Sequence, residues 1–201
     1  MGKTERPPFL ANPEKYKAWR RTAAVIQWLK TLGRGGRWCE VGVAAGVFSE
    51  IIRDVCSPDE LYLVDPWEMP PADYAGGDVF KTITKEELAG WRARVERNLE
   101  RFDNVFVYET TSVEAAKKFE PRYFDVVYID ANHSYDAALA DLNAWHRTVR
   151  EGGSLCGHDF VDGHDFIEVP RAVRDFCEAH PEWYLASVTK EKWPSFQLQR
   201  R

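Results

Sequence analysis

Asp130 and His133 stand three residues apart, directly after the apolar run Val126-Val-Tyr-Ile129. Such a continuous run is typical of a buried parallel strand, and open α/β sheets bind ligands beyond the carboxyl ends of their strands. A carboxylate and an imidazole placed there could hold a metal ion or move a proton. The alternative is a strand followed by a helix that Ser134 caps, with no chemical role.

A second acid follows a later strand candidate in the same way. His158-Asp159 comes after Gly152-Gly-Ser-Leu-Cys156, which predicts a turn and then a strand. If this strand pairs with the strand that ends at Asp130, the two carboxylates converge at one edge of the sheet. Carboxylate oxygens suit Mg²⁺, and an added histidine also permits Mn²⁺. His158 is either such a ligand or a histidine hydrogen-bonded beneath the site.

Glycines mark the first strand-to-helix turn, Glu40-Val-Gly-Val-Ala-Ala-Gly46. They allow a tight turn and let a ligand approach the backbone near a helix N-terminus. Asp65 ends the next strand candidate, where a carboxylate can bind both hydroxyls of a ribose. Together these features indicate a nucleoside-type ligand. A nicotinamide dehydrogenase would need glycines where Ala44 and Val47 stand, so that alternative is disfavoured, and a non-catalytic nucleoside-binding module remains open.

Strand and helix patterns alternate along the chain, which predicts an α/β fold with a mostly parallel sheet covered by helices on both faces. We expect helices to begin near Asn12, Gly46, Thr84, Thr111, Tyr135 and Pro170, with capping boxes at Thr84-Lys-Glu-Glu87 and Thr111-Ser-Val-Glu114. The helix from Tyr135 has apolar positions as far as Val149, and the one from Thr111 extends to Phe119. Strands are expected at 38–41, 61–64, 105–108, 124–129 and after 152–153, and the last two, 183–188 and 195–198, should form an antiparallel pair.

The bulk properties limit the classes of function. The 201 residues are enough for one domain, 1–201, with an N-terminal helical segment at 1–34 and a lid-like loop at 66–83 that contains Trp67, Tyr74 and Phe80. A net charge of −5 argues against a general nucleic-acid binder. Four cysteines without a CxxC pair, and no membrane-length apolar segment, favour a cytoplasmic protein with reduced thiols. The segment before Asn12 is long enough to reach a partner subunit in a homo-oligomer.

Three motifs give a more specific indication. The series Glu40-x-Gly42-x-x-x-Gly46, the acid Asp65 and the strand ending in Asp130 resembles class I S-adenosylmethionine-dependent methyltransferases. The segments 40–49, 129–135 and 152–159 resemble a narrower branch, the small bacterial O-methyltransferases of sugars and natural products of the macrocin type. The resemblance spans about 35–180. It implies a Rossmann-like fold with a mostly parallel seven-stranded sheet and an antiparallel C-terminal pair.

The resemblance also implies which residues bind the cofactor. Gly42, Val43, Ala44 and Gly46 would hold the methionine portion of S-adenosyl-L-methionine, with Glu40 near its ammonium group. The resemblance further implies that Asp65 binds the ribose, that Thr111 and Ser112 lie beside the adenine, and that Asp130 borders the cofactor. For Thr111, a plain helix cap is the alternative.

A metal-assisted reaction is implied by a more distant relative, catechol O-methyltransferase. By that likeness Asp130, His158 and Asp159 are the metal ligands, for Mg²⁺ or Mn²⁺, and His133 is the base that takes the proton of the acceptor hydroxyl. The sequence departs from these patterns in two places: Ala44 stands at the middle glycine of the usual motif, a change that the branch tolerates, and Ala131-Asn132 stands where the branch often has Gly and Asp. The expected acceptor is a small molecule or glycan, either a sugar hydroxyl or, alternatively, a phenol or catechol.

Overall fold

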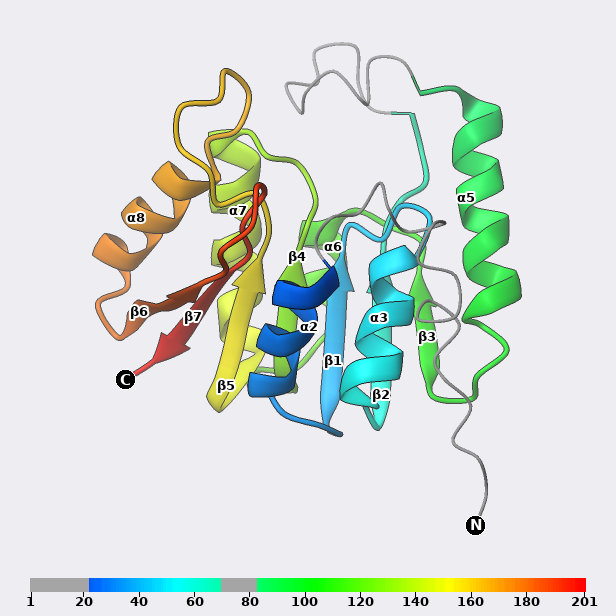
Figure 1. The fold of residues 1–201 in the computed structure, drawn as a ribbon, viewed down its shortest axis with the longest axis horizontal. Coiled ribbons are helices and arrows are strands. Elements are labelled where there is room, and N and C mark those ends of the chain that lie inside the picture. The colour runs from blue at the N-terminus through cyan, green and yellow to red at the C-terminus, as the bar shows by residue number, and fades with distance from the viewer. Residues whose placement is uncertain (1–21, 70–82) are drawn as a thin grey trace.

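The protein, described from a computed structural model over residues 22–69 and 83–201, is built on a seven-stranded sheet between two layers of helices (Figure 1). The expected helix start at Asn12, and Tyr74 and Phe80 of the lid-like loop, lie outside the described residues. In chain order the elements are α2 (Thr22–Thr31), β1 (Arg37–Val41), α3 (Val47–Cys56), β2 (Glu60–Val64), α5 (Lys85–Asn98), β3 (Val105–Tyr108), α6 (Ser112–Ala116), β4 (Phe124–Ile129), α7 (Tyr135–Trp145), the 3-10 helix η1 (His146–Thr148), β5 (Val149–Gly157), α8 (Val169–Ala179), β6 (Trp183–Val188) and β7 (Phe196–Arg200).

The strand order is β3-β2-β1-β4-β5-β7-β6. Strands β1 to β5 are parallel, whereas β7 pairs antiparallel with β5 and β6 pairs antiparallel with β7. The expected mostly parallel sheet with an antiparallel C-terminal pair is therefore confirmed. From β1 the chain first moves outward to β2 and β3, then returns to place β4 on the other side of β1. This reversal creates a crevice at the carboxyl ends of β1 and β4, where such folds bind their ligands.

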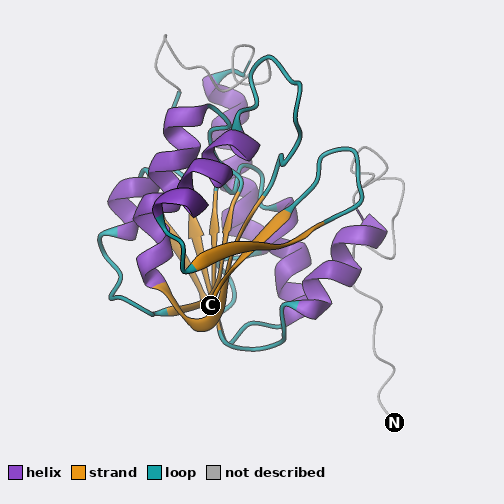
Figure 2. Cartoon of the chain, turned by 90° about the vertical axis from the view of Figure 1, so that its left-hand side faces the viewer, coloured by secondary structure: helices purple, strands orange, loops and turns teal. Residues whose placement is uncertain are grey.

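Each face of the sheet packs against its own set of helices (Figure 2). One apolar core joins α2, α3 and α5 to the sheet through residues such as Leu29, Ile52 and Leu99. The other core joins α6, α7 and α8 to the opposite face through residues such as Trp145 and Phe176. The central strands are buried on both faces, which explains why β2 and β4 read as continuous apolar runs.

Local capping explains where some helices begin and where the sequence prediction was wrong. Thr84 and Glu87 form both hydrogen bonds of a capping box at α5, as expected. Thr111 occupies the N-cap position of α6 but makes no side-chain cap hydrogen bond, so the second capping box is absent. Helix α6 also ends at Ala116, whereas the prediction extended it to Phe119.

The helix from Tyr135 is likewise shorter than its apolar pattern indicated. Helix α7 ends at Trp145, the 3-10 helix η1 turns the chain, and Val149 already belongs to β5, where it pairs with Phe124. Val149 is 1% exposed. Its burial in the sheet placed an apolar residue at a position that continued the helical spacing by coincidence, which periodicity alone cannot distinguish.

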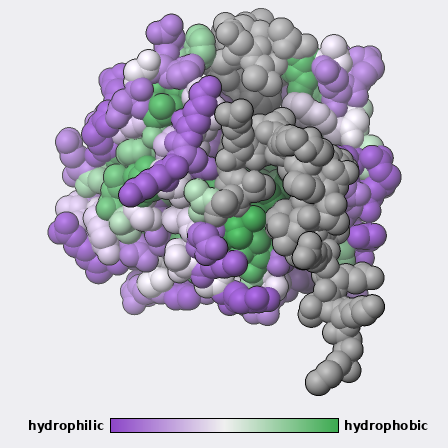
Figure 3. Space-filling view, in the orientation of Figure 1, coloured by the Kyte–Doolittle hydropathy of each residue, from purple (hydrophilic) through white to green (hydrophobic). Residues whose placement is uncertain are grey.

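The surface of the described chain is mixed in polarity. The face in Figure 3 shows mostly hydrophilic residues with small hydrophobic patches between them. Within residues 22–69 and 83–201, no helix has the length and apolar character needed to cross a membrane.

One acid, Asp141, is buried between α6 and α7. Its side chain is only 5% exposed and hydrogen-bonds to Ser112, whose hydroxyl also accepts a bond of 2.9 Å from the indole of Trp145. Burial raises the pKa of Asp141 to about 7, against the opposing effect of the Ser112 hydrogen bond. Between about pH 4 and pH 7, Asp141 therefore stays protonated in the folded protein, whereas the same carboxyl in the unfolded chain, with a pKa of about 3.9, loses its proton.

This difference predicts a pH dependence of stability. Since the folded state binds the Asp141 proton more tightly, the free energy of unfolding should decline as pH rises from about 4 to 7, by up to about 1.4 kcal/mol per pH unit from this group. D141N should remove that decline, and D136N, an exposed acid on the same helix, should keep it. Chemical denaturation between pH 4.5 and 8 measures it. Parallel profiles for wild type and D141N would show that Asp141 ionises as it does in water.

Candidate functional site

The turn between β1 and α3 is held tightly against the neighbouring strand ends. Gly42, at φ 87°, donates its N–H to the Val64 carbonyl of β2 over 2.8 Å. A Cβ atom at Gly42 would lie 2.1 Å from the carbonyl oxygen of Asp130, so only glycine fits at this position. Gly46, at φ 72°, faces Val95 of α5, which a Cβ atom would meet at 2.9 Å.

Asp65 and Trp67 both form hydrogen bonds with the backbone of this turn. One carboxylate oxygen of Asp65 accepts the backbone N–H groups of Val43 and Ala44, each over 2.9 Å, and the other accepts that of Trp67 over 2.8 Å. The indole N–H of Trp67 donates to the Ala44 carbonyl over 2.8 Å. Burial raises the pKa of Asp65, while these N–H groups act to lower it. In this structure the carboxylate of Asp65, which the sequence analysis expected to bind a ribose, accepts hydrogen bonds from the glycine turn instead.

Glu40 is buried, and the Ser112 hydroxyl is already hydrogen-bonded, although both residues were expected to contact the cofactor. Glu40 is 1% exposed, and its carboxylate accepts a hydrogen bond from the Ser49 hydroxyl of α3, inside the β1–α3 unit. The Ser112 hydroxyl is shared between Trp145 and Asp141 of α7. Thr111 is exposed at the carboxyl edge of the sheet. Of the residues expected beside the adenine, Thr111 therefore has the freer side chain.

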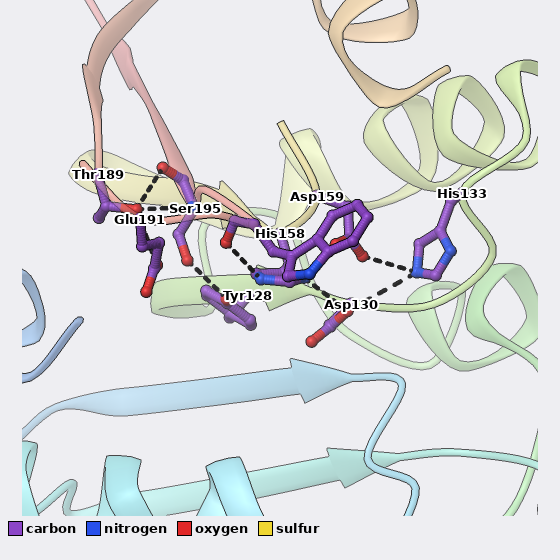
Figure 4. A network of polar contacts seen from close by, with 9 residues as sticks. Tyr128, Asp130, His133, His158, Asp159, Thr189, Glu191 and Ser195 are labelled. Carbon is purple, nitrogen blue, oxygen red and sulfur yellow. Dashed lines mark hydrogen bonds and ion pairs between the residues drawn. The ribbon is translucent and has the colours of Figure 1, made fainter. Parts of the chain in front are cut away.

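A compact acid–histidine cluster lies at the carboxyl ends of β4 and β5 (Figure 4). Nε2 of His133 is 2.9 Å from Asp159 Oδ2 and 3.9 Å from Asp130 Oδ1. Beneath it, Nδ1 of His158 is 2.9 Å from Asp159 Oδ1 and 3.4 Å from Asp130 Oδ1. The structure thus brings together all four residues that the sequence singled out at these two strand ends.

The two carboxylates hold protons on both imidazoles. Burial alone would lower the pKa of His133, but hydrogen bonds and charge from Asp130 and Asp159 outweigh it and raise this pKa to about 10. At His158, burial would likewise lower the pKa, but the charge and hydrogen bonds of Asp130 and Asp159 outweigh it and raise this pKa to about 9. Burial would raise the pKa of Asp159, but its bonds to the two histidines lower it below the ordinary value.

His158 has both ring nitrogens engaged. Its Nε2 lies 2.8 Å from the carbonyl oxygen of Trp193, in the turn between β6 and β7, and the whole residue is 2% exposed. A carbonyl only accepts hydrogen bonds, so Nε2 carries a proton, and Nδ1 faces carboxylate oxygens, which favours a second proton. This geometry favours the reading of His158 as a histidine hydrogen-bonded beneath the site.

The cluster offers a donor set for a divalent cation. One atom each from Asp130, His133 and Asp159 lie within 4.8 Å of one another, with two carboxylate oxygens and one imidazole nitrogen. Such a mixed set fits Mn²⁺, and fits Mg²⁺ through its oxygens. His133 takes the place in this set that the sequence prediction gave to His158. The side-chain oxygen of Asn132 accepts the N–H of Ser134 over 2.9 Å.

Two features of the site had little or no signal in the sequence. The Trp193 carbonyl that binds His158 is a backbone group, which no residue pattern marks. Trp67 stood out only as one aromatic of the lid-like loop, and its contact with the glycine turn was not expected.

An apolar pocket lies beside the cluster, lined by Ile129, Asp130, Ala131, Asn132, His133, Ala138, Leu142, His158, Val169 and Phe196.

Comparison with known proteins identifies the family and the fold. A family model described as a methyltransferase domain matches residues 39–160, which include the glycine turn, Asp65, Asp130 and Asp159. A search of curated protein sequences found no match.

Solved structures of methyltransferases share the fold at low sequence identity. The N-methyltransferase NodS from Bradyrhizobium japonicum aligns with a TM-score of 0.61 and 11% identity, over 94% of this chain and 98% of that one. A putative rRNA methylase from Clostridium thermocellum aligns at 0.62 and 9% identity, over 88% and 93%. Aeropyrum pernix fibrillarin, solved with natively bound S-adenosyl-L-methionine, aligns at 0.56 and 12% identity, over 83% and 67%.

The charge coupling in the cluster predicts a measurable change in one histidine. In the metal-free protein, D159N should lower the pKa of His133 from about 10 toward the ordinary 6.5, because the nearest carboxylate is lost. D162N, an exposed acid in the same loop, should leave it unchanged. NMR titration of the ring nitrogens measures both. A wild-type His133 that titrates near pH 6.5 would contradict this charge coupling.

Proposed function

The chain belongs to a family of class I S-adenosylmethionine-dependent methyltransferases, and we propose that it methylates a hydroxyl of a sugar, polysaccharide or glycosylated natural product. The observation that carries the proposal is the cluster of Asp130, His133 and Asp159, whose donor atoms lie within 4.8 Å of one another beside the glycine turn. A sugar hydroxyl is a weak nucleophile at neutral pH, so its methylation requires groups that take up its proton. The cluster provides such groups.

Methyl transfer is an in-line displacement in which the acceptor oxygen attacks the methyl carbon and the sulfonium sulfur leaves with the bonding electrons. The protein mainly has to align the two partners and remove the proton of the hydroxyl. The turn at Gly42 touches the backbone of Asp130, which places the donor loop next to the cluster. In the proposed reaction the proton goes to Nε2 of a His133 that has first lost its own proton from that atom, beside Asp130 and Asp159.

A divalent cation fits the same three residues. Asp130 and Asp159 would hold it through their carboxylates, and Nε2 of His133, within reach of the same position, would act as the base only where it is not itself a ligand. When bound, Mg²⁺ or Mn²⁺ would lower the pKa of an acceptor hydroxyl and orient it. His133 acts as a base only while it lacks a proton. Its role therefore depends on the carboxylates being engaged elsewhere, since in this structure they hold the proton on it.

Two observations support a sugar acceptor. The segments 129–135 and 152–159 resemble enzymes that act on sugars and natural products. The partly exposed ring of Trp193 lies 4.9 Å from that of His164, and its own carbonyl is bound to His158. An aromatic side chain at this position offers a flat apolar surface next to the reacting groups. A phenol or catechol would stack on the same surface and is the second candidate acceptor.

His133 is the residue whose replacement tests the proposed chemistry. H133A should reduce methyl transfer by at least about 100-fold, since a general base is lost, while S-adenosylhomocysteine binds as before. H180A, which removes a histidine at the end of α8, is the matched control and should keep activity. The assay follows radiolabelled methyl groups into a panel of glycosides and catechols, with and without Mg²⁺, and calorimetry follows binding.

The possible results separate the parts of the proposal. Full activity of H133A would remove the base from the mechanism. Transfer to catechols without transfer to any glycoside would overturn the acceptor class but leave the methyltransferase assignment intact. Equal rates in chelator and in Mg²⁺ would overturn the metal assistance.

A further inference from the structure

The central residue of the glycine turn between β1 and α3 is an alanine, Ala44, in a backbone conformation that favours glycine. Ala44 has φ 48°, between Gly42 at 87° and Gly46 at 72°. A left-handed backbone is unfavourable for a residue with a Cβ atom, whereas glycine adopts it freely. The surrounding structure must therefore supply what holds Ala44 there.

Both polar backbone atoms of Ala44 are held by the segment that follows β2. Its N–H donates to Asp65 over 2.9 Å, and its carbonyl accepts the indole N–H of Trp67 over 2.8 Å. Asp65 in turn accepts the backbone N–H of Trp67 over 2.8 Å. Asp65 and Trp67 thus form one bracket, defined by these three hydrogen bonds, around the single residue that departs from the glycine pattern.

The Trp67 side chain is itself firmly fixed. It is 8% exposed and belongs to the apolar core that α3 and α5 share. The guanidinium of Arg92 lies 5.2 Å from the ring centroid, and Arg92 is anchored by ion pairs with Glu100 and Glu109. Trp67 also has a left-handed backbone, φ 43°, which is rare for a bulky residue. This unfavourable backbone conformation of Trp67 accompanies the hydrogen bond from its indole N–H to the Ala44 carbonyl.

We propose that Trp67 is a positioning residue for the cofactor. Its indole N–H keeps Ala44 in the left-handed conformation, so that the turn is already shaped to receive the methionine portion of S-adenosylmethionine. This inference depends on the cofactor-binding role given to the turn under the proposed function. It explains how this chain tolerates alanine where the usual motif has glycine: the hydrogen bond of Trp67 restricts a backbone that glycine would adopt unaided.

The proposal predicts a specific coupling between positions 67 and 44. W67F removes the N–H together with the five-membered part of the indole, keeps a six-membered aromatic ring in the core, and should weaken S-adenosylhomocysteine binding about fivefold, which corresponds to the loss of one hydrogen bond. In the A44G background the same W67F change should weaken binding less than twofold, because glycine does not need the bracket. Calorimetry on wild type, W67F, A44G and W67F/A44G gives the four dissociation constants.

W38F is the matched control. Trp38 is also buried and also donates its indole N–H to a backbone carbonyl, that of Gly35, over 2.9 Å, at the opposite end of β1. W38F should lower thermal stability without changing the dissociation constant of S-adenosylhomocysteine. The same coupling between positions 67 and 44 should appear in thermal unfolding without ligand, where A44G should raise the melting temperature more in the W67F background than in the wild type.

The outcomes distinguish this inference from the proposed function. If wild type fails to bind S-adenosylhomocysteine, the cofactor assignment fails and the inference with it. If wild type binds, but W67F weakens binding equally in the alanine and glycine backgrounds, Trp67 only packs in the core and the inference alone is overturned. Loss of the W67F effect in the A44G background supports it.

Discussion

The close approach of two turns, at Gly42 and at Asp130, is the constraint on which the rest of the site depends. Their strands pair in parallel, the N–H of Asp130 donates to the Val41 carbonyl over 2.7 Å, and the space beside Gly42 has no room for a Cβ atom. The glycine turn and the acid–histidine cluster are therefore in direct backbone contact. A cofactor bound at the turn would present its methyl group to an acceptor held at the cluster, without any further rearrangement of the sheet.

The cluster is also stabilised by its internal charge balance. Asp130 and Asp159 face the imidazoles of His133 and His158, and the charge and hydrogen bonds of the two acids raise the pKa of both imidazoles. His158 is held from below by the Trp193 carbonyl, so the C-terminal hairpin contributes to the geometry of a site built mainly from β4 and β5. A cation bound by the carboxylates would compete with the proton on His133, which links metal binding to the availability of the base.

Much of this arrangement follows from local sequence patterns, and the remainder depends on contacts that such patterns do not record. Continuous apolar runs and the acids that end them predicted the parallel strands and the convergence of Asp130 with Asp159, because strand order sets which ends meet. The limits of α7 were wrong because Val149 is buried in β5 and still fits a helical period. The position of His158 against the Trp193 carbonyl, and the contact of Trp67 with Ala44, arise from tertiary packing and a backbone carbonyl. No spacing in the sequence marks either one.

A crystal structure grown with S-adenosylhomocysteine and Mn²⁺ tests the central claim most directly, that the donor and the proton-accepting cluster meet where β1 and β4 end. We expect the sulfur atom above the turn at Gly42, and an anomalous Mn²⁺ peak at bonding distance, about 2.1–2.3 Å, from carboxylate oxygens of Asp130 and Asp159. The side of that sulfur which carries the methyl group in S-adenosylmethionine should then face a water or acceptor beside His133. Nucleoside bound away from the turn, or a metal bound away from these carboxylates, would contradict the account.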